Sequence, residues 1–205
     1  MKRSYCMMSA DEAAECIEHG HMVVFSGFTP AGAPKALPAA IARRAMAYHQ
    51  QQKEFQIRLL TGASISAKAD DEMAEADAVA WRAPYQTASV LREKINQGAV
   101  SFVDLHLSEV AQMVSYGFFG EIDVAVIEAS AITADGKVYL SSGIGNAPVF
   151  LHKAKKIIIE LNHYHSPRVA ELADIIMLGA PPRRNTLPIY HTLDKVGQPY
   201  VQVDP

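Results

Sequence analysis

The sequence predicts an α/β fold built on an open, mostly parallel sheet with helices on both faces. Short runs of consecutive apolar residues, as at 22–25 and 157–159, alternate along the chain with segments of helical periodicity. A strand that is apolar on both sides must be covered on both faces, and helices between parallel strands provide that cover. A chain of 205 residues, 49% hydrophobic and 20% charged, is long enough to bury a core without disulfides or metals.

The first half of the chain is expected to alternate helices with strands. Ser9 and Glu12 form a capping-box pattern that predicts a helix start, with Gly20 as its stop. A second helix is expected over 34–48, because Pro38 is tolerated in a first helical turn. Strands are predicted at 22–25, 58–60, 78–81 and 101–105, and a further helix at about 89–97.

The second half continues the pattern and adds a hairpin. A turn at 134–136 separates strands predicted at 123–127 and 137–140, so this pair is expected to be antiparallel. The apolar, β-branched run at 156–160 predicts the clearest strand of the chain. Residues 174–177 predict another.

Two segments are expected: an α/β domain over 1–178 and a proline-rich tail over 179–205. The tail combines prolines with basic and polar residues and ends without a closing helix. Within it, residues 199–203 predict an edge strand or the start of a following segment. Such a composition is typical of a linker, so we expect the tail to lead to a second domain that this chain does not contain.

Composition argues against several classes of function. With 19 basic and 22 acidic residues the net charge is −3, whereas proteins that track nucleic-acid phosphates are normally basic. No apolar run approaches the ~20 residues of a spanning helix, and the start lacks the apolar core of a signal peptide. Cys6 and Cys16 make neither a disulfide framework nor a metal motif. We expect a cytoplasmic protein with no nucleic-acid or membrane partner.

Small residues follow two of the predicted strands, where ligands bind in open parallel sheets. One loop is S-G-F-T-P-A-G at 26–32, and the other is T-G-A-S at 61–64. Glycines there let backbone N–H groups approach a phosphate or carboxylate closely. The alternative is that these glycines only permit tight turns between strand and helix. No nucleotide-binding G-x-G-x-x-G or G-x-x-x-x-G-K-[ST] motif is present.

A third glycine-bearing loop, at 142–148, precedes a predicted helix. Asn146 is placed as its N-cap and Pro148 in its first turn. The loop is therefore either an anion-binding nest or simply a capped helix start, and the capped start accounts for all of its residues.

Other reactive side chains give weaker signals. The His163 and His165 pair, with His106 at another strand end, does not define a zinc site on its own. No G-x-S-x-G motif supports a serine hydrolase. Glu128 could serve as a carboxylate nucleophile or base if it is buried, but a strand-end glutamate that bonds to neighbouring backbone is the commoner case. Cys16 lies inside an amphipathic helical pattern and is expected in the core.

Motifs along the whole chain resemble the amino-terminal domain of the acetyl-CoA hydrolase/transferase family, which includes succinyl-CoA:acetate CoA-transferases. The matching motifs, in order, are SGFTPAG at 26–32 with PKA at 34–36, RLLTGAS at 58–64, RAPYQ at 82–86, FVDLHLS at 102–108, IGNAP at 144–148, IELN at 159–162, PRR at 182–184 and GQP at 197–199.

The resemblance implies a CoA-transferase-like α/β domain that is half of a two-domain enzyme. Family members carry their catalytic glutamate, which forms a glutamyl-CoA thioester, in the carboxy-terminal domain. No residue of this chain is therefore assigned a catalytic or metal-binding role. Coenzyme A enters as a substrate and no separate cofactor is implied.

The resemblance also implies partners and a site. The partners are acyl-CoA (acetyl or succinyl), small carboxylates and a carboxy-terminal CoA-transferase domain, and a homo-oligomer is expected. Two other hypotheses stay open: a non-catalytic anion-binding or split-enzyme assembly subunit, and a stand-alone hydrolase with a histidine-bound metal. The expected substrate-binding wall consists of Gly27, Phe28, Thr29, Thr61, Gly62, Ala63, Gly145 and Asn146.

Overall fold

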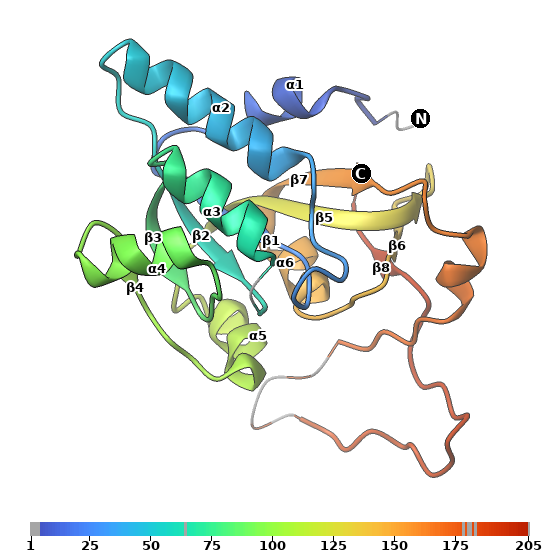
Figure 1. Cartoon of the computed structure of the whole chain (residues 1–205). Helices are drawn as coiled ribbons and strands as arrows, with labels where there is room; N and C mark the ends of the chain where they lie inside the picture. The colour runs from blue at the N-terminus through green and yellow to red at the C-terminus, as the bar shows by residue number, and fades with distance from the viewer. Residues whose placement is uncertain (1–4, 64, 178, 180–181, 183, 205) are drawn as a thin grey trace.

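A mixed sheet forms the centre of the computed structural model, which describes residues 5–63, 65–177, 179, 182 and 184–204 (Figure 1). The strands run in the order β4-β3-β2-β1-β5-β6-β8, and β7 pairs with β5. All pairs from β4 to β5, and the pair of β5 with β7, are parallel. Only the β5–β6 and β6–β8 pairs are antiparallel within the described chain. The predicted mostly parallel sheet is confirmed.

The elements follow the predicted alternation. The strands are β1 Met22–Phe25, β2 Ile57–Thr61, β3 Val79–Ala83, β4 Ser101–Phe102, β5 Ile122–Ile132, β6 Lys137–Leu140, β7 Ala154–Leu161 and β8 Val201–Gln202. The helices are α1 Ala10–Ala14, α2 Leu37–Gln50, α3 Ala67–Glu75, α4 Ser89–Asn96, α5 Leu107–Tyr116 and α6 Ala147–Lys153, with a 3₁₀ helix η1 at Pro167–Glu171.

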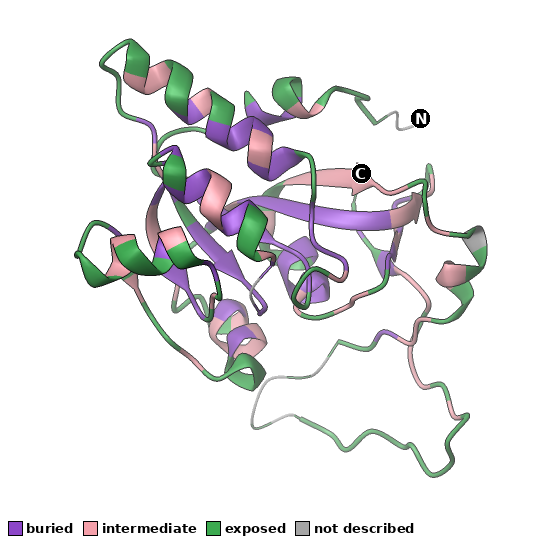
Figure 2. Ribbon diagram, in the orientation of Figure 1, coloured by how far each residue is buried: buried purple, intermediate pink, exposed green. Residues whose placement is uncertain are grey.

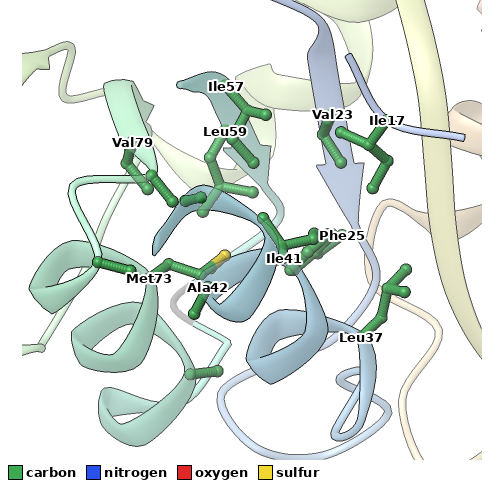
Figure 3. Close-up of a cluster of buried hydrophobic side chains, with 14 of the residues drawn as sticks. Ile17, Val23, Phe25, Leu37, Ile41, Ala42, Ile57, Leu59, Met73 and Val79 are labelled. Atoms are coloured by element: carbon green, nitrogen blue, oxygen red, sulfur yellow. The ribbon is translucent and has the colours of Figure 1, made fainter. Parts of the chain in front are cut away.

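Two hydrophobic cores lie on the two faces of the sheet. Val23 and Phe25 of β1 point to the face covered by α1 to α4 (Figure 3), whereas Met22 and Val24 point to the face covered by α5 and α6. This alternation has the period of two expected of a strand. It explains why β1 is apolar at every position, and Figure 2 shows the buried sheet between the inner faces of the helices.

Two predicted boundaries are corrected by the structure. The capping box of Ser9 and Glu12 is present, but α1 ends at Ala14 rather than near Gly20. The helix expected from residue 34 begins at Leu37, with its proline in the first turn as predicted.

The strand predicted at 174–177 is wrong. Ile175 makes only an isolated antiparallel bridge, with Gln198. The Asp174 carboxylate accepts the backbone N–H groups of Val196 and Gly197, the two residues before Gln198, at 3.1 and 2.7 Å. A side chain therefore replaces the backbone partner that a ladder would need, and the pairing stops.

The last part of the chain returns to the sheet. Figure 1 shows residues 184–200 extending away from the body before β8 joins the edge of the sheet at β6. Val201 and Val203 are buried in the second core. The predicted edge strand is thus present, shortened to two residues, while a division at residue 178 stays a prediction.

A buried ion pair holds the loop after β3. The guanidinium of Arg82 donates to both oxygens of Asp70 on α3, at 3.3 Å each, and neither side chain is exposed. Arg82 also donates to the carbonyls of Ala83 and Tyr85, so it ties the loop to the sheet. Burial raises the pKa of Asp70, and the charge of Arg82 opposes that rise.

We expect Asp70→Asn to lower the free energy of unfolding by about 3–5 kcal/mol, because the buried guanidinium of Arg82 loses its counter-charge. Urea denaturation followed by circular dichroism measures the loss. Asp77→Asn is the matched control, since Asp77 is largely exposed and pairs with Lys94 at the surface. That exposed pair should contribute less than about 1 kcal/mol. Equal losses in the two variants would contradict this interpretation of the Asp70–Arg82 pair.

Candidate functional site

Three loops meet at the carboxyl ends of β1 and β2, and two of them were predicted there from their small residues. They are residues 26–33 after β1, 61–63 at the end of β2 and 141–146 after β6, and we call them the loop cluster. A Cβ atom added to Gly62 would lie 3.3 Å from Asn146 Nδ2 and 3.4 Å from the Gly27 carbonyl oxygen. One added to Gly145 would lie 3.4 Å from that same carbonyl. The three expected glycines are therefore neighbours.

The glycines of the loop cluster do more than permit turns. A Cβ at Gly32 would lie 2.9 Å from the Gly143 carbonyl oxygen, and one at Gly143 only 2.6 Å from the Ala31 carbonyl oxygen. Gly27 adopts φ +124°, and a Cβ there would meet Ala33 at 2.9 Å. Side chains at these positions would force the loops apart, so these glycines serve the packing of the loops as well as their turns.

The other residues expected in the substrate-binding wall differ in how far their side chains are exposed. Phe28 and Thr29 are exposed at the tip of the first loop, and Thr29 adopts a left-handed φ of +54°. Thr61 is fully buried and donates its hydroxyl to the carbonyl of Ala63. The Thr61 side chain therefore shapes its loop, while Phe28 is free to contact a ligand.

Asn146 stands at the N-cap position of α6, as predicted, but its side chain makes no capping bond. Its Nδ2 atom is buried and has no hydrogen-bond partner in the described part of the chain. A buried donor left unpaired costs roughly 1–3 kcal/mol. The capped-start interpretation is therefore right about position and wrong about the bond, and Asn146 presents a donor inside the loop cluster.

Glu128 lies within β5 rather than at its end, and its side chain is fully buried. Its Oε2 accepts from Lys35 Nζ and, at 3.2 Å, from Asn162 Nδ2. Its Oε1 accepts from the Ser141 hydroxyl, and His165 Nε2 lies 3.8 Å away. Sequence reasoning found the glutamate but not these four partners, because they come from segments far apart along the chain.

The neighbouring glutamate has a different task. Glu160 of β7 lies in register with Glu128. Its carboxylate accepts the backbone N–H groups of Lys35, Ala36 and Leu37 at 2.6–3.2 Å. These N–H groups lie at the start of α2 and have no acceptor within the helix, because its N-cap residue, Ala36, has no side-chain acceptor. Glu160 is thus a helix cap supplied by another strand.

The histidines do not gather into a ligand set. His163 is exposed, His165 faces Glu128, and His106 precedes α5 at the surface. Among the described residues, no group of three or more His, Cys, Asp or Glu side chains is placed to hold a metal ion. Cys6 and Cys16 are free thiols, and Cys16 is only partly buried rather than in the core.

A cavity of about 520 Å³ adjoins the loop cluster. Its volume lies in the range of pockets that bind small molecules. It runs between α5, the start of α6 and the beginning of the tail. Its lining includes Gln112, Ser115, Gly145, Asn146, Ile175 and Arg184.

The described helices include none that is long and apolar enough to cross a membrane. This finding concerns the described helices alone.

The fold, a mostly parallel sheet covered on both faces, resembles that of a solved coenzyme A-transferase. The structure of glutaconate coenzyme A-transferase from Acidaminococcus fermentans matches with a TM-score of 0.58, over 75% of this chain and 68% of that chain. At 15% sequence identity this likeness concerns the fold alone.

The sequence comparison is more specific. The model of the acetyl-CoA hydrolase/transferase N-terminal domain matches residues 2–205, so the chain belongs to the acetyl-CoA hydrolase/transferase family. The whole chain aligns with the propanoyl-CoA:succinate CoA transferase of Escherichia coli strain K12 at 71% identity, and the alignment covers 42% of that protein. The chain also aligns with the succinyl-CoA:acetate CoA-transferase of Clostridium kluyveri at 42% identity. That alignment covers 95% of this chain and 36% of the relative. The chain thus spans less than half the length of these relatives.

Gly143→Ala should separate the loops of the cluster, because the new Cβ would lie 2.6 Å from a backbone oxygen that cannot rotate away. We expect a stability loss of about 1–3 kcal/mol and shifted amide resonances for Gly27, Gly62 and Asn146 in ¹H–¹⁵N spectra.

Gly98→Ala provides the control. Gly98 also has a positive φ, but nothing lies within 4 Å of the position of its Cβ. Its substitution should therefore strain the backbone locally and leave the three resonances in place. Unmoved resonances in Gly143→Ala would show that the loops are not in contact.

Proposed function

We propose that this chain is the amino-terminal part of an enzyme that moves coenzyme A between an acyl-CoA, acetyl or succinyl, and a small carboxylate. The observation that carries the proposal is the 71% identity, over the whole chain, to a protein named as a propanoyl-CoA:succinate CoA transferase. The convergence of three glycine-bearing loops beside a small-molecule-sized cavity supports it.

The chemistry proposed for the complete protein is a double displacement. A carboxylate of the enzyme attacks the acyl-CoA thioester, which releases CoA thiolate and leaves an acyl-glutamyl anhydride. The thiolate attacks the anhydride, releases the first carboxylate and forms a glutamyl-CoA thioester. A second carboxylate then reverses the sequence, so atoms balance without a further cofactor and coenzyme A is a substrate throughout.

We place the glutamate nucleophile outside this chain. The buried carboxylate best able to compete for the role is Glu128, and both of its oxygens already accept hydrogen bonds. Glu160 is held by the N–H groups at the start of α2. A carboxylate occupied by donors is a weak nucleophile, because attack requires giving up those bonds. No described residue of the chain is therefore assigned a catalytic role.

The role proposed for this chain is the wall that holds the acyl and acceptor carboxylates. Gly145 is exposed, so its backbone is within reach of a ligand, whereas Gly27 and Gly62 are buried and would support the wall from behind. The unpaired Nδ2 of Asn146 supplies a further donor for a carboxylate oxygen. Phe28 and Thr29 would contact the acyl group from the exposed tip of the first loop.

The proposed partner is a carboxy-terminal CoA-transferase domain, which the longer relatives have room to contain. Large apolar side chains are exposed on the tail and near η1, where such a domain would cover them. A homo-oligomer and a cytoplasmic location stay predictions. The exposed residues are Leu172, Met177, Leu187, Ile189, Tyr190 and Leu193.

Acetyl-CoA mixed with succinate tests the function directly, with succinyl-CoA and free CoA measured by mass spectrometry. The 205-residue chain alone should give neither product, because the nucleophile is absent. The longer protein that carries this chain should give succinyl-CoA with ping-pong kinetics. Turnover by the chain alone would place the nucleophile within it, and an inactive longer protein would favour a non-catalytic anion-binding or assembly subunit.

Asn146→Ala tests the wall. Since Nδ2 has no partner in the described protein, its removal should leave the melting temperature unchanged or slightly raised. In the longer protein the variant should raise KM for the carboxylate roughly tenfold, the loss of one hydrogen bond to a charged group. Asn96→Ala, on the exposed end of α4, is the matched control and should change neither quantity. A clear loss of stability in Asn146→Ala would mean that Nδ2 serves the fold instead.

A further inference from the structure

Glu128 stands at the point where the segments that carry the loop cluster meet. Its strand, β5, pairs with β1, β6 and β7, which lead into the loops after them. Its carboxylate has no exposed surface, yet it receives hydrogen bonds from three different segments. Buried ionised groups are retained at a cost in desolvation, and apolar replacements are often as stable. Stability alone therefore does not account for a glutamate here.

Both ends of the first loop are tied to Glu128. At one end, the Glu128 backbone N–H donates to Ser26 Oγ at 2.9 Å, and that hydroxyl donates across the loop to the Gly32 carbonyl at 2.7 Å. At the other end, Lys35 Nζ donates to the Ala33 carbonyl at 2.9 Å and to the Glu128 carboxylate. Residues 26–33 are thus closed into a ring whose base is one residue of β5.

The third loop and the segment after β7 are tied to the same carboxylate. Ser141 is the first residue of the 141–146 loop, and its hydroxyl donates to Glu128 Oε1. Asn162 follows β7, donates its side-chain Nδ2 to Glu128 Oε2, and accepts the Tyr164 N–H at 3.0 Å through its side-chain Oδ1. One carboxylate therefore contacts segments at the base of two of the loops, and these two loops approach each other closely at Gly32, Ala31 and Gly143.

We propose that Glu128 is a positioning residue: its carboxylate, through Lys35, Ser141 and Asn162, holds the loops that carry Gly27 and Asn146 in the arrangement that binds the substrate carboxylate. The inference rests on the proposed function for its substrate and on the described contacts for its geometry. Glu128 acts through other residues and does not touch the reacting atoms.

Glu128→Gln in the longer protein is the primary test. The amide keeps the size of the side chain, but its NH₂ faces groups that all donate, and the ammonium of Lys35 loses its counter-charge. We expect KM for the carboxylate to rise at least roughly tenfold while kcat changes less than about threefold. In the 205-residue chain the amide resonances of Gly27 and Asn146 should shift.

Matched variants separate positioning from stability. Asp71→Asn changes another carboxylate that caps a helix, since Asp71 accepts the N–H groups of Val90 and Leu91 at the start of α4. Asp71 contacts none of the described donors to Glu128, so this variant should lower the melting temperature with KM unchanged. Ser141→Ala removes one contact with little change in volume, and should raise KM in the same direction by a smaller factor. It also keeps the test informative if Glu128→Gln does not fold.

Two results would overturn the proposal. If Glu128→Gln and Ser141→Ala both lower stability without altering KM or the resonances, Glu128 serves only the fold. If Glu128→Gln loses more than about a thousandfold in kcat with KM unchanged, it acts in the chemistry itself. Failure of the proposed function is a separate outcome: the unsubstituted longer protein would then show no transfer, while the resonance shifts in the chain would still report on the geometry.

Discussion

A carboxylate buried out of contact with water must be neutralised and hydrogen-bonded, and this requirement at Glu128 organises the part of the molecule where the loops meet. The donors that satisfy it are Lys35, Ser141 and Asn162, which come from three segments far apart in sequence. Each donor lies at the base of a loop. The hydrogen bonds to the Glu128 carboxylate therefore hold the loops at the carboxyl ends of several strands close together.

Carboxylates from other segments also satisfy the N–H groups at two helix starts. The helices α2 and α4 have alanine at their N-caps, Ala36 and Ala88, which offer no side-chain acceptor. Glu160 of β7 accepts N–H groups of the first, and Asp71 of α3 accepts those of Val90 and Leu91 in the second. Carboxylates at helix starts also complement the helix dipole. Both helices are thus anchored by neighbours rather than by their own sequences.

Glycines allow the closest contacts within the loop cluster. The approach of Gly32 to Gly143, and of Gly62 to Asn146, leaves no room for side chains between the loops. Positions held so closely cannot adjust independently. A cavity adjoins the loop cluster, and apolar residues of the tail are exposed. The chain that carries both spans less than half the length of its longer relatives.

The sequence by itself determined the fold class, most strands and the three glycine-bearing loops, because strand burial and turn chemistry are local patterns. The hairpin of β5 and β6 and the position of Asn146 before α6 were predicted in this way. Only the tertiary structure decided that Ile175 makes a single bridge, that the Asn146 amide is unpaired, and that Glu128 is bound by Lys35. These features depend on partners supplied by distant segments, and no local pattern encodes a partner that only the folded sheet brings near.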